Sequence, residues 1–198
     1  MITFSNLPDT EPYQRFHDSF QAALAEEQPH VHAAAISSYD PAKRLVDSRF
    51  VNIKYIDGED WLFFTNYNSP KADAFSGHDQ ICALFFWPST YTQIRIHATI
   101  SRLSPTRSDS HFQGRTDPKN ALAISSDQSK PVDNIQTVID NFDRTLESAD
   151  LRKRPDYWGG YVFKPHYFEF WKGSEYRLNH RRAFEKKDGQ WIESILQP

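Results

Sequence analysis

Hydrophobic residues recur with two different periods along the chain, which predicts both helices and strands. Between residues 10 and 27, Tyr13, Phe16, Phe20 and Leu24 follow one another at spacings of three and four, as on one face of an α-helix. Residues 91–103 alternate instead between apolar and polar side chains, which is the period of a half-buried strand. Similar short apolar runs recur through the chain, so the pattern predicts an α+β protein that is mainly β.

The stretch from residue 49 to residue 71 predicts the hairpin around which the other elements are arranged. Its two apolar runs, RFVNIKYI and WLFFT, are joined through Asp57 and Gly58, and an Asp-Gly pair between such runs is a hairpin signal. Residues 31–39 read as a strand that comes before it. The segment PAKRLVDS, residues 41–48, is expected to be the loop leading into the hairpin.

The remaining elements follow from caps, breakers and periodicity. A short helix is expected to end with Gly77 as its C-cap, and residues 80–87 are apolar throughout, as in a strand buried on both faces. Ser104 and Pro105 start a helix that is expected to carry His111 and Arg115 on one face. Further helices are predicted around residues 121–124 and over 133–148, the latter with an apolar side. A loop is predicted at 127–131.

The last fifty residues return to β structure, and a final hairpin turns at Asp188 and Gly189. The sequence shows no internal repeat, low-complexity tract or linker. We therefore expect a single domain over residues 1–198, with the helix at 10–27 leading in and a β segment at 158–198 completing it.

Composition excludes several classes of function. The 23 basic and 26 acidic residues leave a net charge of −3, so bulk electrostatics give no reason to expect nucleic-acid binding. Cys82 is the only cysteine, which excludes an intrachain disulfide and a thiolate metal cluster, and no metal site is expected. The first twenty residues lack the features of a signal peptide, and no apolar run approaches the roughly 20 residues that span a bilayer. We expect a cytoplasmic protein with no membrane partner.

Basic residues mark both strands of the central hairpin. Arg49 begins the first strand, Lys54 lies within it, and Lys71 follows the second strand after a polar cluster that includes Asn66 and Ser69. Cationic groups beside backbone amides and hydroxyls suit a phosphate-bearing ligand. On composition alone, solvated edge residues are the alternative interpretation.

The order of these residues resembles the pyridoxamine 5′-phosphate oxidase family, whose members are flavoproteins with an FMN-binding split β-barrel. The family pattern R-x-V-x-x-K, then F-[YF]-T-N-x-x-S-x-K, is matched between Arg49 and Lys71. A second block, W-G-G-[YF] and E-F-W-x-G-x-x-x-R-L-x-x-R, is matched between Trp158 and Arg181. The resemblance covers roughly residues 33–198. It implies a mainly β split barrel with peripheral helices and a homodimer that binds FMN at the subunit interface.

The resemblance also implies which residues form the site. The residues expected to bind FMN are Arg49, Phe50, Val51, Asn52, Ile53, Lys54, Phe64, Thr65, Lys71, Gln93, Gln128, Ser129, Trp171 and Arg181. The residues expected to bind a phosphorylated ring substrate are Lys54, His111, Arg115, Lys119, Arg177 and Asn179, with Arg177 as the catalytic residue. The implied reaction is hydride transfer from the substrate to the flavin, with O₂ as acceptor.

The departures from the family pattern fall mainly in the substrate site. His111 and Lys119 replace a Tyr and a Ser of the phosphate pattern, and Asn179 replaces a His beside the substrate ring. Asn cannot take up a proton or a charge as His can. Next to the flavin, Pro70 stands where an Arg is usual. Three alternatives therefore stay open: an oxidase of another ring compound, as in phenazine biosynthesis, a non-catalytic FMN-binding protein, and a barrel that has lost its cofactor.

Overall fold

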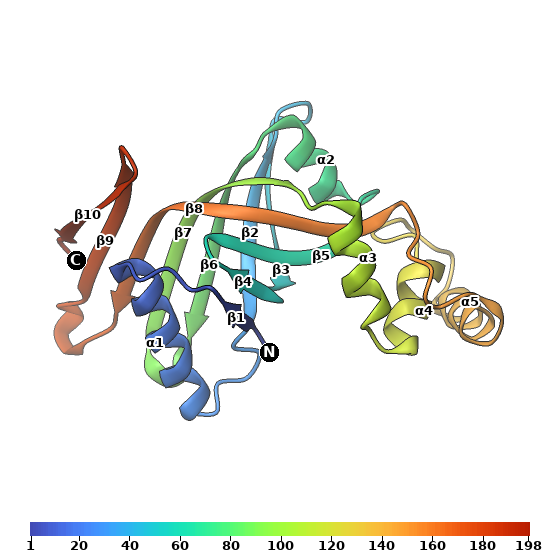
Figure 1. The fold of residues 1–198 in the computed structure, drawn as a ribbon, viewed down its shortest axis with the longest axis horizontal. Helices are drawn as coiled ribbons and strands as arrows, with labels where there is room; N and C mark the ends of the chain where they lie inside the picture. Colours follow the sequence, from blue (N-terminus) through green and yellow to red (C-terminus); the bar gives the residue numbers. More distant parts are fainter.

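A computed structural model describes residues 1–198 and shows one ten-stranded sheet with five helices around it (Figure 1). The helices are α1 (Glu11–Ala25), α2 (Pro70–Gly77), α3 (Pro105–Gln113), α4 (Asp117–Ser125) and α5 (Ile135–Ser148), with short 3₁₀ turns η1 (Pro88–Thr90) and η2 (Glu175–Arg177). The strands are β1 (Thr3–Ser5), β2 (Ala33–Asp40), β3 (Leu45–Asn52), β4 (Tyr55–Asp57), β5 (Asp60–Asn66), β6 (Gln80–Trp87), β7 (Thr92–Arg102), β8 (Trp158–Lys172), β9 (His180–Lys187) and β10 (Gln190–Leu196).

The long strand β8 holds the two ends of the sheet together. One edge of β8 pairs with β7 from Tyr161 to Lys172. Its other edge pairs with β5 over its first residues and with β9 over its last ones. The sheet order β1-β4-β5-β8-β7-β6-β2-β3 therefore divides at β8, where the hairpin β9–β10 leaves the main path (Figure 1). All pairs are antiparallel except the short β1–β4 pair.

Helix α1 covers one face of the sheet because its apolar side is aromatic. Phe16 and Phe20 are buried and pack edge-on against Trp61, Phe85 and Trp87 of the strands beneath. Edge-to-face aromatic pairs of this kind add to the stabilisation that comes from burying apolar area. The predicted helix at 10–27 is thus confirmed, and the core lies between α1 and the curved sheet.

The region around the central hairpin differs from the prediction. The expected loop at 41–48 is wrong in its second half, because β3 begins at Leu45 and pairs with β2 as far as Asn52. The run RFVNIKYI is two strands, since pairing breaks at Ile53 and Lys54 before β4 starts. The turn through Gly58, whose φ is +60°, joins β4 to β5 as predicted. The chain changes pairing partners in the middle of the run, which its hydrophobic pattern does not reveal.

Four smaller predictions also need correction. Strand β6 is buried on one face only, and on the other face Phe86 is 50% exposed. Helix α3 ends at Gln113, so Arg115 lies in the turn after it and not on the helix. Gly77 is the last residue of α2, and the C-cap is His78. The helix predicted at 133–148 is present as α5, but none of its residues is buried and Ile135 is 70% exposed.

None of the five helices combines the length and the apolar character that crossing a membrane requires.

Candidate active site

A cleft of about 540 Å³ lies where the end of β3, the strand β5 and the start of β8 meet the helices α2, α3 and α4. It is lined by Phe50, Val51, Asn52, Lys54, Phe64, Thr65, Lys71, His111, Gly114, Arg115, Thr116, Lys119, Gln128 and Trp158. Four of these side chains are Lys or Arg, and none is Asp or Glu. The cleft is therefore a site for an anionic ligand.

Lys71 is the most buried cation of the cleft, at 7% exposed. Its position follows from α2, which begins at Pro70 and directs the side chain back under β5. The Nζ atom donates to Ser69 Oγ at 3.1 Å and to Thr65 Oγ1 at 3.3 Å, and it has no carboxylate partner. Burial, and then the charge of Arg49, lower the pKa of Lys71 to about 8. A buried ammonium group held only by hydroxyls favours an added anion.

Arg49 lies beside Lys71 but points away from the cleft. Its guanidinium donates to Ser38 Oγ at 2.8 Å and to the Ile36 carbonyl at 3.2 Å, and it pairs with Asp47 at 2.6 Å. The fold fixes this orientation through Ile36 and Ser38 of β2 and through Asp47 of β3 itself. In the single chain, Arg49 therefore does not line the cleft, and it affects the cleft through its charge, which lowers the pKa of Lys71.

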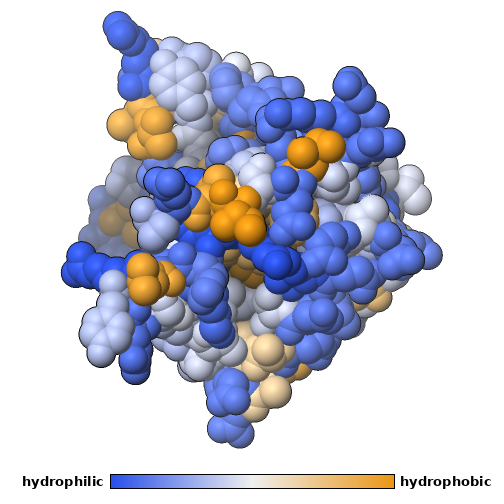
Figure 2. Space-filling view, turned by 90° about the vertical axis from the view of Figure 1, so that its left-hand side faces the viewer, coloured by the Kyte–Doolittle hydropathy of each residue, from blue (hydrophilic) through white to orange (hydrophobic).

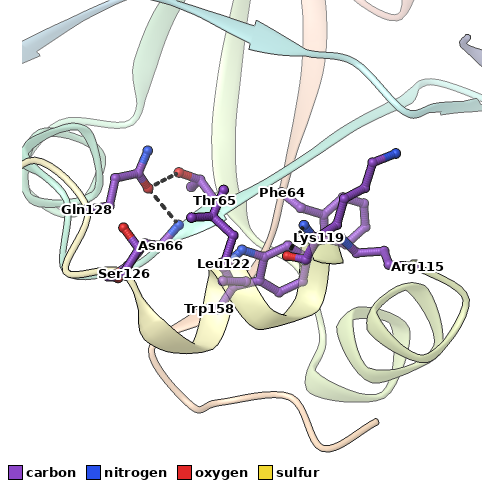
Figure 3. A pocket seen from close by; sticks show the side chains of 10 residues that line it. Phe64, Thr65, Asn66, Arg115, Lys119, Leu122, Ser126, Gln128 and Trp158 are labelled. Carbon is purple, nitrogen blue, oxygen red and sulfur yellow. Dashed lines mark hydrogen bonds between the residues drawn. The ribbon is translucent and has the colours of Figure 1, made fainter. Parts of the chain in front are cut away.

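Gln128 closes the cleft from the loop that follows α4. Its Oε1 accepts hydrogen bonds from Thr65 Oγ1 and from the Asn66 backbone N–H, both at 3.2 Å (Figure 3). The Asn66 side chain also donates to the Ser126 carbonyl at 3.5 Å, which ties the loop to β5. A smaller pocket of about 240 Å³ continues the cleft here and shares Phe64, Arg115 and Trp158 with it.

A second group of cations, Lys54, Arg115 and Lys119, comes from the break between β3 and β4 and from the α3–α4 junction. Arg115 lies 4.4 Å above the Trp158 ring and donates to the Lys119 carbonyl at 3.0 Å. Its Nη1 atom is buried and has no partner. Burial lowers the pKa of Arg115 to about 10, and burial and the charges of Lys119 and Arg115 lower the pKa of Lys54. A bound anion would offset both the burial of Arg115 and the positive charges that act on Lys54.

His111 forms one wall of the cleft. Its ring stacks on Phe64 with 3.6 Å between the ring centroids and 10° between the planes, and Nδ1 lies 2.9 Å from the Tyr55 hydroxyl. Burial and the charges of Arg115, Lys54 and Lys119 lower the pKa of His111 to about 4. His111 is therefore a neutral side chain at physiological pH.

The other predicted flavin residues gather at the far end of β8. Gln93, Trp171 and Arg181 are direct cross-strand neighbours on β7, β8 and β9. Arg181 pairs with the buried Glu169 at 2.8 Å, and Arg95 pairs with the same carboxylate. This strand end is remote from the cleft, as Figure 1 shows by the positions of β9 and of α3–α4.

Arg177 and Asn179 lie in the turn that connects β8 to β9. Arg177 and Tyr176 have positive φ values of 61° and 57°, and Tyr176 is 90% exposed. Asn179 Oδ1 accepts from the Ser174 N–H at 3.3 Å and shapes this turn. Neither residue lines the cleft of its own chain.

The structure thus divides the predicted site residues into two sets. The set that lines the cleft is Phe50, Val51, Asn52, Lys54, Phe64, Thr65, Lys71, His111, Arg115, Lys119 and Gln128. The set that does not is Arg49, Ile53, Gln93, Ser129, Trp171, Arg177, Asn179 and Arg181. Ile53 is fully buried in the core, and Ser129 is in the loop beside Gln128, with a φ of 69°. Sequence reasoning gave no role to Trp158, although the W-G-G block contains it.

Comparison with known proteins places this architecture among the split-barrel flavoproteins. Residues 158–198 match the family model described as the pyridoxine 5′-phosphate oxidase C-terminal dimerisation region. The pyridoxine/pyridoxamine 5′-phosphate oxidase of Synechocystis sp. is 33% identical over 189 residues, covering 94% of this chain and 88% of that protein. The enzyme of the same name from Herminiimonas arsenicoxydans is 34% identical over 190 residues, covering 95% and 90%.

Solved structures agree. PhzG from Burkholderia lata 383, in complex with tetrahydrophenazine-1-carboxylic acid, has a TM-score of 0.89 at 25% identity, covering 96% of this chain and 94% of that one. A pyridoxamine 5′-phosphate oxidase-related, FMN-binding protein from Nostoc punctiforme shares the fold with a TM-score of 0.79 at 14% identity, covering 96% and 100%.

The chain belongs to the pyridoxine/pyridoxamine 5′-phosphate oxidase family. It is an FMN-dependent oxidoreductase with the split β-barrel fold, so the fold, the class of enzyme and the cofactor predicted from the sequence are confirmed. The match to a dimerisation region supports a homodimer.

Proposed function

We propose that the chain is an FMN-dependent oxidase of pyridoxamine or pyridoxine 5′-phosphate, with O₂ as the acceptor and an active site formed by two copies of the chain. The observation that carries this proposal is the pair of separate cationic groups in one cleft without a carboxylate. Lys71 forms one group and Lys54, Arg115 and Lys119 form the other. A cofactor phosphate and a substrate phosphate each require such a group.

The first group suits the FMN phosphate. Lys71 supplies a buried charge without an anionic partner, Arg49 adds a second charge, and Gln128 with Ser129 adds polar atoms from the neighbouring loop. Bound FMN supplies the hydride acceptor and the reaction with O₂. The task of this chain is to orient the two reactants and to exclude water from between them.

The second group suits the substrate phosphate. Burial and the charges of Lys119 and Arg115 lower the pKa of Lys54, and burial and the charges of Arg115, Lys54 and Lys119 lower the pKa of His111. The Nη1 atom of Arg115 has no hydrogen-bond partner within the chain. Trp158 holds the Arg115 guanidinium from below, so the donor is positioned before the substrate arrives.

The geometry of β8 supports a site shared between two chains. Trp158 and Trp171 are thirteen positions apart on one strand, which is about 40 Å along its path at the usual rise per residue. The cleft and the Gln93–Trp171–Arg181 set lie toward opposite ends of the molecule (Figure 1), so we expect one FMN molecule to contact only one of the two sets of the same chain. If both sets contact the cofactor, Trp171, Arg177, Asn179 and Arg181 come from the partner subunit.

A substrate panel tests the proposal. The FMN-loaded protein should form peroxide with pyridoxamine or pyridoxine 5′-phosphate and much less with the unphosphorylated forms. Arg115→Ala should raise KM about 10- to 100-fold while FMN affinity stays the same, because the lost contact is a charge-assisted hydrogen bond to substrate. Arg144→Ala, an exposed arginine of α5, is the matched control and should leave KM unchanged.

A second candidate substrate is a ring compound that carries a carboxylate in place of a phosphate. Asn179 favours this alternative, since it replaces the His that the family places beside the pyridine ring, and PhzG shares the fold with a phenazine carboxylate bound. If neither B6 phosphate is oxidised, and Asn179→His does not produce that activity, the phosphate proposal is wrong. Oxidation of an aromatic ring carboxylate by the same protein would then identify the substrate class.

A further inference from the structure

Helix α3 is attached to β4 by two side-chain contacts that lie one helical turn apart. Arg107 pairs with Asp57 at 2.7 Å, and His111 Nδ1 lies 2.9 Å from the Tyr55 hydroxyl. Tyr55 and Asp57 alternate with the buried Ile56, so both point outward from the core toward α3. Only the second contact involves a residue that lines the cleft.

We infer that Tyr55 is a positioning residue that holds His111 as the neutral tautomer protonated on Nε2, so that His111 offers an uncharged N–H donor to a phosphate monoester in the cleft. The phosphate part of this inference rests on the proposed function, whereas the tautomer does not. Tyr55 lines no part of the cleft itself. Its effect on the ligand passes entirely through the imidazole ring.

We assign the direction of the Tyr55–His111 hydrogen bond from the partners that each group has within the chain. The Tyr55 hydroxyl makes no other hydrogen bond within the chain, so Nδ1 is the acceptor within reach for its proton. A neutral imidazole carries one proton, and an accepting Nδ1 requires that proton to be on Nε2. Nε2 makes no hydrogen bond within the chain and is not buried, so it is free to donate to a ligand.

The surroundings keep the ring neutral. Phe64 covers one face with 3.6 Å between the ring centroids, and burial and then the charges of Arg115, Lys54 and Lys119 lower the pKa of His111 to about 4. Arg107, one turn earlier on α3, adds another positive charge that Asp57 offsets. A neutral donor adds a hydrogen bond to the phosphate without adding repulsion among the cations that already bind it.

The tautomer can be measured directly in the FMN-loaded protein. Nitrogen NMR of ¹⁵N-histidine-labelled protein, with the His111 signals assigned through His111→Gln, should show a protonated Nε2 and an unprotonated Nδ1 from about pH 5 upward. In Tyr55→Phe the two tautomers should mix. Inorganic phosphate, titrated as the probe, should then bind about threefold to tenfold more weakly, with FMN affinity unchanged.

Two variants separate this role from a structural one. Arg107→Ala loosens the other α3–β4 contact and should leave the tautomer and phosphate affinity as in the wild type. His111→Gln keeps an N–H donor near the Nε2 position, so Tyr55→Phe should have no further effect on phosphate binding in that background.

Three results would overturn the inference. They are a proton on Nδ1 in the wild type, unchanged phosphate affinity in Tyr55→Phe, or an equal loss in Arg107→Ala. Because none of these readouts needs turnover, they are independent of the identity of the oxidised substrate. An enzyme that oxidises no B6 phosphate, yet shows the expected tautomer and phosphate response, would refute the proposed function and leave this inference standing.

Discussion

The side chain of Lys71 combines burial, hydrogen bonds to hydroxyls and a neighbouring positive charge. It is 7% exposed, it is held by two hydroxyls, and its ammonium group is near the guanidinium of Arg49. Burial and a neighbouring like charge both disfavour the protonated form, which is why the pKa falls to about 8. A bound phosphate supplies a counter-charge that outweighs both effects, so protonation of Lys71 and binding of FMN are coupled.

This coupling predicts how FMN affinity depends on pH. Below about pH 8 Lys71 is already protonated in the cofactor-free protein, and the affinity should not change with the state of this group. Above that pH, binding must be accompanied by uptake of a proton, so Kd should rise by up to about tenfold per pH unit. Fluorescence titration of cofactor-free protein with FMN between pH 7 and 10 measures this slope.

Two variants provide the controls for the pH dependence. Lys71→Met should weaken FMN binding at pH 7 by about 1–3 kcal/mol and remove the dependence above pH 8, because no ammonium group is left to titrate. Lys43→Met changes an exposed lysine that pairs with Asp40, and should behave as the wild type. A slope that survives in Lys71→Met would assign the titration to another group.

Individual residues show what the sequence can predict about the site. The match to the family found Lys54, Lys71, Arg115 and Lys119, and the structure brings all four into one cleft. Arg49 is directed toward β2 and Lys54 lines the cleft, and the break in strand pairing that begins at Ile53 lies between them. The contact between His111 and Tyr55 was not foreseen, because it depends on how α3 packs on β4.

Among the elements, the β8–β9 pair holds a buried charge network. Glu169 is 3% exposed and lies between Arg181, at 2.8 Å, and Arg95. Burial alone would raise the pKa of Glu169, but the hydrogen bonds and charges of Arg181 and Arg95 outweigh burial and lower it. The network joins β7, β8 and β9 at the strand end that carries Trp171.

Glu169→Gln should destabilise the protein by about 1–3 kcal/mol, because it leaves two arginines without their shared counter-ion. A carboxyl whose folded pKa is depressed contributes stability above its unfolded pKa, and this contribution disappears as the pH falls. The difference between wild type and Glu169→Gln should therefore shrink below pH 4.5, the ordinary value for this group. Urea unfolding without FMN, at several pH values, measures it.

The matched control is Glu193→Gln, which breaks the exposed Arg182–Glu193 pair of β9 and β10. An exposed pair of this kind contributes at most about 1 kcal/mol, so the change should be small at every pH. If both variants unfold alike, the Glu169 network does not stabilise this end of the sheet.

Elements were predictable wherever one face is buried in the single chain. The alternation of β7 and the aromatic face of α1 gave both elements correctly, because their apolar sides pack into the core. Strand β3 has no buried residue, and Leu45 and Val46 are 54% and 67% exposed, so its pattern contains no periodicity that marks it as a strand. The sequence predicted both β6 and α5. However, β6 is buried on one face and not on both, and no residue of α5 is buried.

For the whole molecule, these exposed apolar residues agree with a second copy. Phe50 is 76% exposed at the cleft, and Phe86 is 50% exposed on the outer face of β6. At the β9–β10 end, hydrophobic side chains are exposed among hydrophilic ones (Figure 2), and Leu178 and Ile195 are 68% and 80% exposed. Exposed apolar surface of this extent is typical of interfaces.

The central claim is that each FMN site takes residues from two chains, and hybrid dimers test it most directly. Lys71→Met alters the cleft, and Arg181→Ala alters the strand end that is proposed to serve the partner's cleft. Each homodimer should therefore bind FMN weakly. A hybrid of the two variants, isolated through two different affinity tags, has one site with both changes and one site with neither.

The measurement is the number of FMN molecules bound per hybrid dimer at an FMN concentration that saturates the wild type but not either variant. A shared site predicts one FMN per hybrid dimer, bound with wild-type affinity. A site contained within one chain leaves every site of the hybrid with one change, so no FMN would bind with wild-type affinity, and that result would contradict the account.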